Sequence, residues 1–384
     1  MARFDDLTQH LVIEILLRLP ADSLMQLKFV SKSWHCLIGN PLFVAGQHNY
    51  YARSPSRYDN LCILLQPHCL DTRLNVFKKS VTDGEDNDFP NFRVVTLRLP
   101  LNNDNANFQI VGFCDVIICL YNQDKVILAN PVIRELRILP NSCISPCSEL
   151  ESRSIIGVGF GYDLKTNEYK VVRVYKDRKK GDCNFPPQRR AEVYSLSVDS
   201  WKEIDGPVME MKIDNVVWEV PFIYRARLQR YWNGAYYWLG STSDPLKKVI
   251  VLFDITCEVF QYMTLPESCY ELRGDCNLIE LNGSPALSVF FWKWEENCQG
   301  YFDIGTMNEF GANGTWTKLM RIGPLWRMGF PLTLFIRGNK LLMLYRGQIV
   351  SYDLTTKQMK KLPPYGEAFQ TWIFKKSLVS LTSH

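Results

Sequence analysis

The sequence predicts a mainly β chain that begins with a small three-helix unit. Apolar residues recur at helical spacing in roughly the first 40 residues, and short apolar or alternating runs joined by Asp, Asn, Gly and Pro fill most of the remainder. The chain has 384 residues, of which 46% are hydrophobic, so it is long enough to bury more than one core. We therefore expect two structural parts of unequal size.

The first helix is predicted to end before Pro20 and to carry one broad apolar face. The residues of that face are Leu7, Leu11, Val12, Ile15, Leu16 and Leu19. Asp22 or Ser23 is expected to cap a second helix, and Pro41 to end a third at Asn40. Three short helices cannot bury this many apolar side chains among themselves, so the surplus must pack on another surface.

The longer part of the chain repeats one pattern, in which a strand, a turn rich in Asp, Asn or Ser, and a second strand follow each other. The segments with this pattern are 125–140, 191–205, 248–266, 314–324 and 347–363. Two more hairpins are predicted at 157–175 and at 230–240, where Asn233 and Gly234 form the joint. The uneven spacing of about 40 to 70 residues favours radial repeats, and hence a β-propeller-like domain, with a large β-sandwich as the alternative.

Composition excludes several classes of partner and site. The net charge is +4, from 44 basic and 40 acidic residues, which gives no general attraction to nucleic acid. We find no secretory leader and no run near the ~20 apolar residues of a membrane span. The twelve cysteines contain no Cys-x-x-Cys pair, so no metal site is predicted. We expect a soluble protein of the cytoplasm or nucleus.

No catalytic or cofactor-binding residue is predicted. The chain has five histidines, and none of them lies between residues 69 and 383. Ser-His-Asp and Cys-His catalytic arrangements are therefore excluded from the predicted β domain. The glycine-rich run at 157–161 lies in strand-like sequence, so we expect close backbone packing there and no phosphate loop. A binding role without catalysis follows from these observations.

The N-terminal residues resemble an F-box. The matching motifs are Asp6-Leu7, Ile15-Leu16, Leu19-Pro20, Ser23-Leu24, Phe29-Val30-Ser31-Lys32-Ser33-Trp34 and Leu37-Ile38, and Thr8 stands where F-boxes often have Pro. The resemblance implies that the surplus apolar face binds a Skp1-type adaptor and, through it, cullin-1 and a RING subunit. The adaptor contacts it implies are Leu7, Leu11, Ile15, Leu16, Leu19, Pro20, Leu24, Val30 and Trp34. The alternative is a helical cap that packs only on the β body.

The β part resembles the F-box-associated region of plant F-box proteins. The matching motifs are Asn130-Pro131, Gly159-Phe160-Gly161-Tyr162-Asp163, Tyr169-Lys170-Val171-Val172-Arg173, Ser200-Trp201-Lys202-Glu203 and Ser351-Tyr352-Asp353-Leu354. Within that family the layout is most similar to S-locus F-box proteins, the pollen-side determinants of self-incompatibility. The resemblance implies an F-box at 1–48, a connecting segment with the first strands at 49–105, and a β-propeller-like substrate-recognition domain at 106–384.

The resemblance implies a non-catalytic substrate-recognition subunit of an SCF-type (Skp1–cullin–F-box) E3 ubiquitin ligase. The S-locus likeness further implies binding of non-self S-ribonucleases in the pollen tube. Two alternatives stay open, an SCF receptor for another plant substrate and an adaptor-independent propeller that binds a glycan or protein. The candidate substrate contacts lie in a basic loop, whose alternative role is simple solvation, and they are Lys176, Arg178, Lys179, Lys180, Phe185, Arg189 and Arg190.

Overall fold

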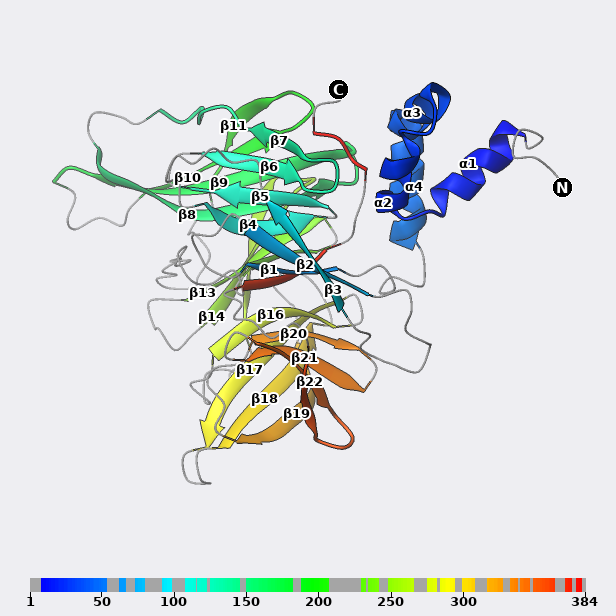
Figure 1. The fold of residues 1–384 in the computed structure, drawn as a ribbon. Coiled ribbons are helices and arrows are strands. Elements are labelled where there is room, and N and C mark those ends of the chain that lie inside the picture. The colour runs from blue at the N-terminus through cyan, green and yellow to red at the C-terminus, as the bar shows by residue number, and fades with distance from the viewer. Residues whose placement is uncertain are drawn as a thin grey trace.

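Figure 1 shows a computed structural model in which a ring of β-sheets lies beside a group of helices. The structure describes residues 8–53, 62–66, 73–79, 92–98, 108–145 (without 115, 123 and 124), 150–181, 188–206, 229–265 (without 233 and 242–247), 275–307 (without 282, 283 and 294–298), 316–326, 332–362 (without 338, 346 and 347), 370–374 and 378–381. None of the helices within these ranges has the length and hydropathy to span a bilayer.

The predicted helical unit is present, and it contains four helices where the sequence pattern predicts three. They are α1 (Gln9–Leu17), α2 (Ala21–Leu27), α3 (Lys32–Gly39) and α4 (Pro41–Arg53). The predicted cap of the second helix is wrong, because α2 begins directly after Pro20 and contains both Asp22 and Ser23. The cap of α3 is Ser31, whose Oγ accepts a hydrogen bond from Trp34 N at 3.2 Å.

The additional helix α4 starts at the proline that was expected only to end α3. Proline is well tolerated at the first position of a helix, because its φ is already helical and its missing N–H would have no intrahelical partner there. Asn40 Oδ1 accepts a hydrogen bond from Leu42 N at 2.8 Å, which satisfies one free amide of the new helix. Pro41 therefore both ends α3 and begins α4.

The described strands form five sheets. The first contains β24 (Gln370–Phe374), β1 (Cys62–Gln66), β2 (Arg73–Lys79) and β3 (Phe92–Arg98). The second contains β4 (Gln109–Cys114), β5 (Ile117–Tyr121), β6 (Val126–Asn130) and β7 (Glu135–Ile138). The third contains β8 (Leu150–Asp163), β9 (Glu168–Lys179), β10 (Gln188–Ser195) and β11 (Ser200–Ile204).

The fourth sheet contains β12 (Gln229–Trp232), β13 (Ala235–Ser241), β14 (Lys248–Asp254) and β15 (Val259–Thr264). The fifth begins with β16 (Asp275–Leu281), β17 (Ser284–Lys293), β18 (Gln299–Met307) and β19 (Trp316–Trp326). It continues with β20 (Leu332–Arg337), β21 (Lys340–Tyr345), β22 (Gln348–Asp353) and β23 (Met359–Lys361). A short parallel pairing of Glu280 and Leu281 with Phe335 and Ile336 joins its two antiparallel halves.

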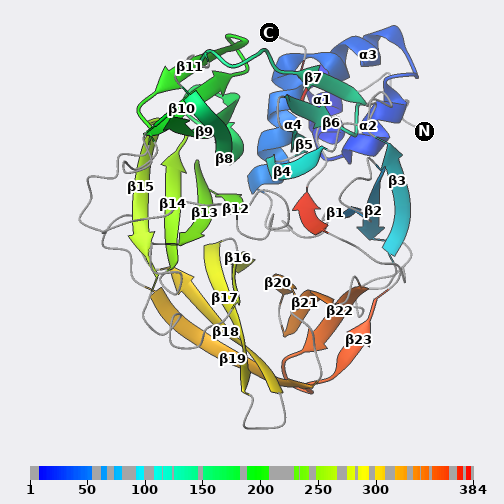
Figure 2. The same cartoon turned by 90° about the vertical axis from the view of Figure 1, so that its left-hand side faces the viewer.

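The sheets stand around a common centre, as Figure 2 shows, so the predicted β-propeller-like architecture is confirmed. The ring is closed by strands from both ends of the chain, since β24 pairs antiparallel with β1 from Cys62 opposite Phe374 to Gln66 opposite Gln370. The ring therefore includes strands that precede residue 106, where the sequence predicts the propeller domain to begin.

One turn recurs at several hairpins and explains why they form. An aspartate at the end of the first strand accepts hydrogen bonds from the amides two and three residues later, at Asp163, Asp254 and Asp353. The residue four positions after each aspartate has a positive φ, at Asn167 (56°), Glu258 (57°) and Lys357 (58°). These local hydrogen bonds reverse the chain within a few residues.

The structure confirms the predicted hairpins at 125–140, 157–175, 191–205, 230–240, 248–266 and 347–363. The prediction of a hairpin at 314–324 is wrong. The described part of that segment belongs to the single strand β19, which pairs with β18 along its length. The segment has no Asp, Asn or Ser after Trp316 that could start the recurring turn.

The glycine-rich run is confirmed as a site of close packing between the third and fourth sheets. A Cβ on Gly159 would lie 2.8 Å from the Trp238 side chain, and one on Gly161 would lie closer still to Tyr231. Trp238 Nε1 donates a hydrogen bond to the Val158 carbonyl at 3.2 Å across the same contact. The two sheets approach closely because the glycines leave room for these rings.

Candidate functional site

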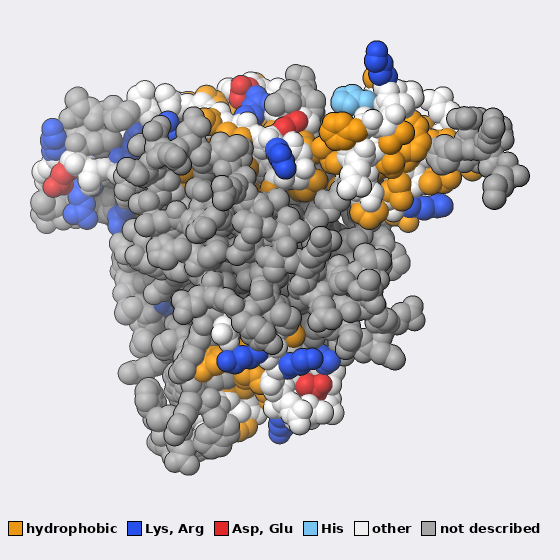
Figure 3. Space-filling view, in the orientation of Figure 1, with side chains coloured by type: hydrophobic (Ala, Val, Ile, Leu, Met, Phe, Trp, Pro, Cys, Tyr) orange, Lys and Arg blue, Asp and Glu red, His pale blue; other side chains and the backbone are white. Residues whose placement is uncertain are grey.

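Apolar side chains remain exposed on the helical unit. Twelve large hydrophobic side chains are exposed among the described residues, and half of them lie on these four helices and their connections. These six are between 40% and 86% exposed, and they are Leu11, Ile15, Phe29, Val30, Leu42 and Tyr50. Figure 3 shows hydrophobic side chains gathered over the helices. We call these six residues the apolar patch, and such a patch is typical of a protein-binding surface.

Other apolar side chains of the helical unit are packed. Leu16, Leu24 and Ile38 are buried and form one cluster with Ala21 and Phe43. This cluster extends to the ring through Val132 and Ile133 of the β6–β7 turn and through Leu378. The helices therefore do pack on the β body, as the cap alternative expects, and they still leave the apolar patch uncovered.

The structure divides the predicted adaptor residues into three groups. Leu11, Ile15, Pro20 and Val30 are exposed, and Leu19 and Trp34 are half-buried. Leu16 and Leu24 are almost completely buried, so in this structure they hold the helices together and present no surface to a partner. Leu7 lies outside the described residues.

Three members of the apolar patch were missed by the sequence reasoning, namely Phe29, Leu42 and Tyr50. A signal for Leu42 exists in the sequence. Consecutive residues on a helix point about 100° apart, so with Phe43 at the centre of the buried face, Leu42 lies at or beyond its edge, and it is 83% exposed. That argument needs α4, which the sequence pattern did not predict. Phe29 follows the end of α2, where helical periodicity no longer applies.

The basic residues predicted to contact substrate lie on β9, on β10 and in the turn between them. Arg178, Lys179 and Lys180 are exposed, and Lys176 is half-buried. Figure 1 shows that β9 and β10 reach away from the helices, and Figure 3 shows Lys and Arg side chains at that edge. Phe185 lies outside the described residues. We call Arg178, Lys179 and Lys180 the basic tip.

The two remaining predicted contacts are less available. Arg190 donates two hydrogen bonds to the Glu203 carboxylate, at 2.8 and 2.9 Å, so its guanidinium is already engaged. Arg189 is half-buried, and this burial lowers its pKa. The sequence places all these charges in one loop, but the structure leaves only part of them open to a partner.

Buried ionic contacts fix the strands beneath the basic tip. Asp177 accepts hydrogen bonds from Arg153 Nε and Nη2 at 2.7 and 2.6 Å, a bidentate pair. Further along the sheet, the buried Glu192 carboxylate accepts from Arg173 Nε and from the Tyr175 hydroxyl, both at 2.8 Å. The long strands β9 and β10 are thus held rigidly where they leave the core.

The titratable groups of this region are structural in character. Burial alone would raise the pKa of Glu192, but the adjacent Arg173 and the hydrogen bonds it accepts outweigh burial and lower the pKa. Burial and the Glu192 carboxylate raise the pKa of the Cys143 thiol to about 11, so at neutral pH that thiol stays protonated. These are the shifts of paired and buried groups, and neither creates a nucleophile.

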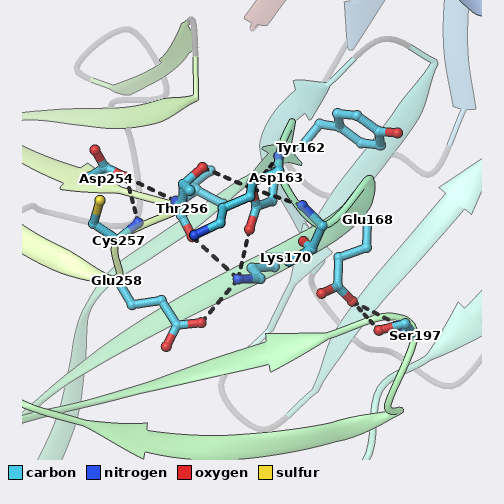
Figure 4. A network of polar contacts seen from close by, with 12 residues as sticks. Tyr162, Asp163, Glu168, Lys170, Ser197, Asp254, Thr256, Cys257 and Glu258 are labelled. Carbon is cyan, nitrogen blue, oxygen red and sulfur yellow. Dashed lines mark hydrogen bonds and ion pairs between the residues drawn. The ribbon is translucent and has the colours of Figure 1, made fainter.

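Figure 4 shows a second polar network, between the third and fourth sheets. Lys170 Nζ lies 2.9 Å from Asp163 Oδ2 and 3.0 Å from Glu258 Oε1, and Glu258 also pairs with Lys202. Thr256 Oγ donates to Asp163 Oδ1 at 2.8 Å. The charges compensate each other, so this network joins the sheets. Across the described ranges, no three His, Cys, Asp or Glu residues are grouped to hold a metal ion.

Comparison with known proteins gives the family. The family model for the F-box domain matches residues 4–45, and the model described as F-box associated beta propeller domain matches residues 68–371. The chain is 25% identical over 367 residues to F-box protein CPR1 of Arabidopsis thaliana, covering 92% of this chain and 83% of that protein. It is 24% identical over 367 residues to an F-box/kelch-repeat protein of the same plant, covering 91% and 88%.

Solved structures resemble the chain only distantly. A protein of unknown function from Bacteroides caccae covers 83% of this chain and 100% of its own, at 10% identity and a TM-score of 0.39. The family models, in contrast, span both structural parts, the helical unit and the ring of sheets. The chain therefore belongs to the F-box proteins that carry an F-box-associated β-propeller domain.

Proposed function

We propose that this protein is the substrate-recognition subunit of an SCF-type E3 ubiquitin ligase. The observation that carries the proposal is the apolar patch, which remains exposed on an F-box whose own buried cluster is packed on the ring. Proteins of this family typically act as substrate adaptors. In this proposal a Skp1-type adaptor covers the patch and links the chain to cullin-1 and a RING subunit.

The arrangement of the two parts suits this role. The F-box lies on one side of the ring, and the basic tip projects on the other side, as Figure 1 shows. A substrate held there is kept at high effective concentration near the ubiquitin-charged partner, and its transfer requires no nucleophile from this chain. The proposal therefore assigns binding and orientation to the chain and leaves catalysis to its partners.

Adaptor binding is tested by charge substitutions in the apolar patch. We expect Ile15→Asp and Val30→Asp each to weaken binding of a Skp1-type adaptor by more than about tenfold, since a few central apolar residues dominate such interfaces. Matched controls are Leu164→Asp and Val198→Asp, which change apolar side chains of the ring that are as exposed as Val30. Circular dichroism should show folded protein in all four variants. Unchanged adaptor affinity in both patch variants would overturn the proposal.

For the substrate we propose a non-self S-ribonuclease, captured in the cytoplasm of the pollen tube. The support is the resemblance of the sequence motifs to S-locus F-box proteins, while the alternative is another plant protein bound by the same ligase. The test is to immobilise the chain with its adaptor, pass style extract over it and identify retained proteins by mass spectrometry. Retention of a secreted ribonuclease from some genotypes and not others is the expected result. Retention of unrelated proteins alone would refute this substrate.

The basic tip is the proposed contact on the substrate side. Replacing Arg178, Lys179 and Lys180 together by alanine should weaken substrate capture and leave adaptor binding unchanged. A charge-matched control replaces the exposed Lys357, Lys360 and Lys361 by alanine. Equal capture by both triple variants would move the contact to another part of the ring.

A further inference from the structure

Residues 378–381 lie between the helices and the ring, as the red segment of Figure 1 shows. We call them the tail segment. The side chain of Leu378 is 2% exposed and belongs to the same cluster as Leu16 and Leu24 of the F-box. The side chain of Leu381 is completely buried and belongs to the main core of the ring. Two residues three positions apart thus enter the cores of two different structural parts.

Val379, between these two leucines, also contacts the ring. Val379 packs against the core of the ring, next to the cluster that contains Leu381. Its carbonyl accepts a hydrogen bond at 2.7 Å from Nδ2 of Asn130, at the end of β6. Asn130 Oδ1 accepts in turn from Val132 N at 2.9 Å, and Val132 packs on the helices. One amide side chain therefore holds the tail segment and the turn that carries the direct contact with the F-box.

Charged side chains of β7 fix the tail segment further. Glu135 accepts hydrogen bonds from Leu381 N at 2.6 Å and from the Ser380 hydroxyl at 2.9 Å. Arg137 Nη1 donates to the Leu381 carbonyl at 2.7 Å and pairs with Asp199 of the neighbouring sheet at 3.0 Å. The backbone of the tail segment is thus hydrogen-bonded to side chains of the second sheet, and Arg137 links that sheet in turn to Asp199 of the third.

We propose that the tail segment sets the orientation of the F-box relative to the propeller, with Leu378 and Glu135 as positioning residues. Leu378 supplies the apolar contact to the helices, and Glu135 fixes the backbone that presents it. The same apolar cluster also contains the β6–β7 turn, where Val132 and Ile133 are only partly buried. A single turn gives a pivot, and a second anchored contact beside it restricts rotation about that pivot.

The proposal is tested by measuring an inter-part distance in the full chain. Spin labels are attached through encoded non-natural amino acids at Ala45 on α4 and Leu164 in the β8–β9 turn, both exposed, so that the native cysteines stay unlabelled. Pulsed electron resonance then gives the distribution of distances between the labels. In Glu135→Ala and Leu378→Ala we expect that distribution to become roughly twice as wide.

Matched controls separate orientation from stability. Glu151→Ala removes an exposed carboxylate of β8, and Leu362→Ala removes a leucine that is buried as deeply as Leu378 but lies outside the contact. Both controls should keep the narrow distribution even if Leu362→Ala lowers the unfolding temperature. Glu135→Ala decides the question if Leu378→Ala disturbs the F-box core. Narrow distributions in Glu135→Ala and in every folded Leu378→Ala sample would overturn the proposal.

A functional consequence rests on the proposed ligase role. With the tail segment released, adaptor binding and substrate capture should each persist, while ubiquitin transfer to the captured substrate should slow several-fold, because the substrate is no longer held in one direction. The distance measurement needs neither adaptor nor substrate. Failure of the positioning role would appear in that measurement, whereas failure of the ligase role would appear as lack of adaptor binding by the unmodified chain.

Discussion

The ammonium group of Lys170 lies 3.0 Å from the Glu258 carboxylate, and this ion pair joins two neighbouring sheets of the propeller. Lys170 also pairs with Asp163, whose side chain is completely buried at the end of β8. A propeller depends on contacts between adjacent sheets, since each sheet is hydrogen-bonded mainly within itself. Here a charged network supplements the apolar packing at the junction between the third and fourth sheets.

We predict that Lys170→Met lowers the free energy of unfolding by about 3 kcal/mol, because it leaves the Asp163 carboxylate buried without its counter-charge. Urea denaturation followed by tryptophan fluorescence measures the change. Lys165→Met, in the exposed turn beside it, is the control and should differ from the unmodified chain by less than about 0.5 kcal/mol. Similar values for both variants would show that the network contributes little.

The free energy of unfolding should decrease in acid, because several paired carboxylates have a lowered pKa in the folded chain. Burial alone would raise the pKa of Asp163, Glu192, Glu258 and Asp303, but their basic partners and hydrogen bonds outweigh burial and lower it. A folded-state pKa below the unfolded value means that the unfolded chain binds more protons in acid. The stabilisation is therefore present above about pH 5 and is lost as the pH falls further. Thermal unfolding scanned from pH 7 to pH 3 measures this, and a flat profile would contradict it. Lys170→Met should show a shallower decline.

Much of the fold could be predicted from local sequence patterns. The recurring aspartate turn fixes a hairpin within a few residues, which is why segments such as 157–175 and 347–363 could be predicted from sequence. The segment 314–324 has no aspartate to form that turn, so it continues as one strand and the predicted hairpin does not form. Helix α4 was missed because Pro41 can both end and begin a helix, and local sequence does not say which of these occurs.

The candidate site was less predictable, because it depends on contacts between distant residues. Helical periodicity places Leu16 and Ile15 near one face of α1, but it does not show that Leu16 faces the core and Ile15 faces solvent. That distinction is set partly by Leu378, more than 350 residues away in the chain. The contact between Glu135 and Ser380 likewise has no local signal, since neither residue belongs to a motif.

The recurring turn predicts a stabilising substitution at Lys357. This exposed residue has a φ of 58°, a conformation that costs a side chain roughly 1 kcal/mol and costs glycine almost nothing. Part of the gain is lost to the greater freedom of glycine in the unfolded chain, so we expect Lys357→Gly to raise the free energy of unfolding by about 0.5 kcal/mol. The control Lys360→Gly, within strand β23, should lower it. Denaturation midpoints compare the three proteins, and destabilisation by Lys357→Gly would contradict the prediction.

Cys143 provides a chemical test of the buried cluster around Glu192. Cys143 is exposed as a residue, but its Sγ donates a hydrogen bond to the Glu192 carboxylate at 3.3 Å. Partial burial of the thiol and this carboxylate raise the pKa of Cys143 from 9.0 to about 11. At pH 7.5 this lowers the thiolate fraction about 100-fold, and the thiolate is the species that reacts with iodoacetamide. A thiolate of higher pKa is also a stronger nucleophile, which offsets about half of this effect, so we expect Cys143 to be alkylated about tenfold more slowly in the folded chain than in the same chain in urea, as followed by peptide mass spectrometry. The slow reaction should accelerate about tenfold per pH unit up to about pH 10, because each unit increases the thiolate tenfold. Folded-state alkylation as fast as in urea would mean that the thiol is not held against Glu192, and the cluster would then lose its assigned role at the base of the basic tip.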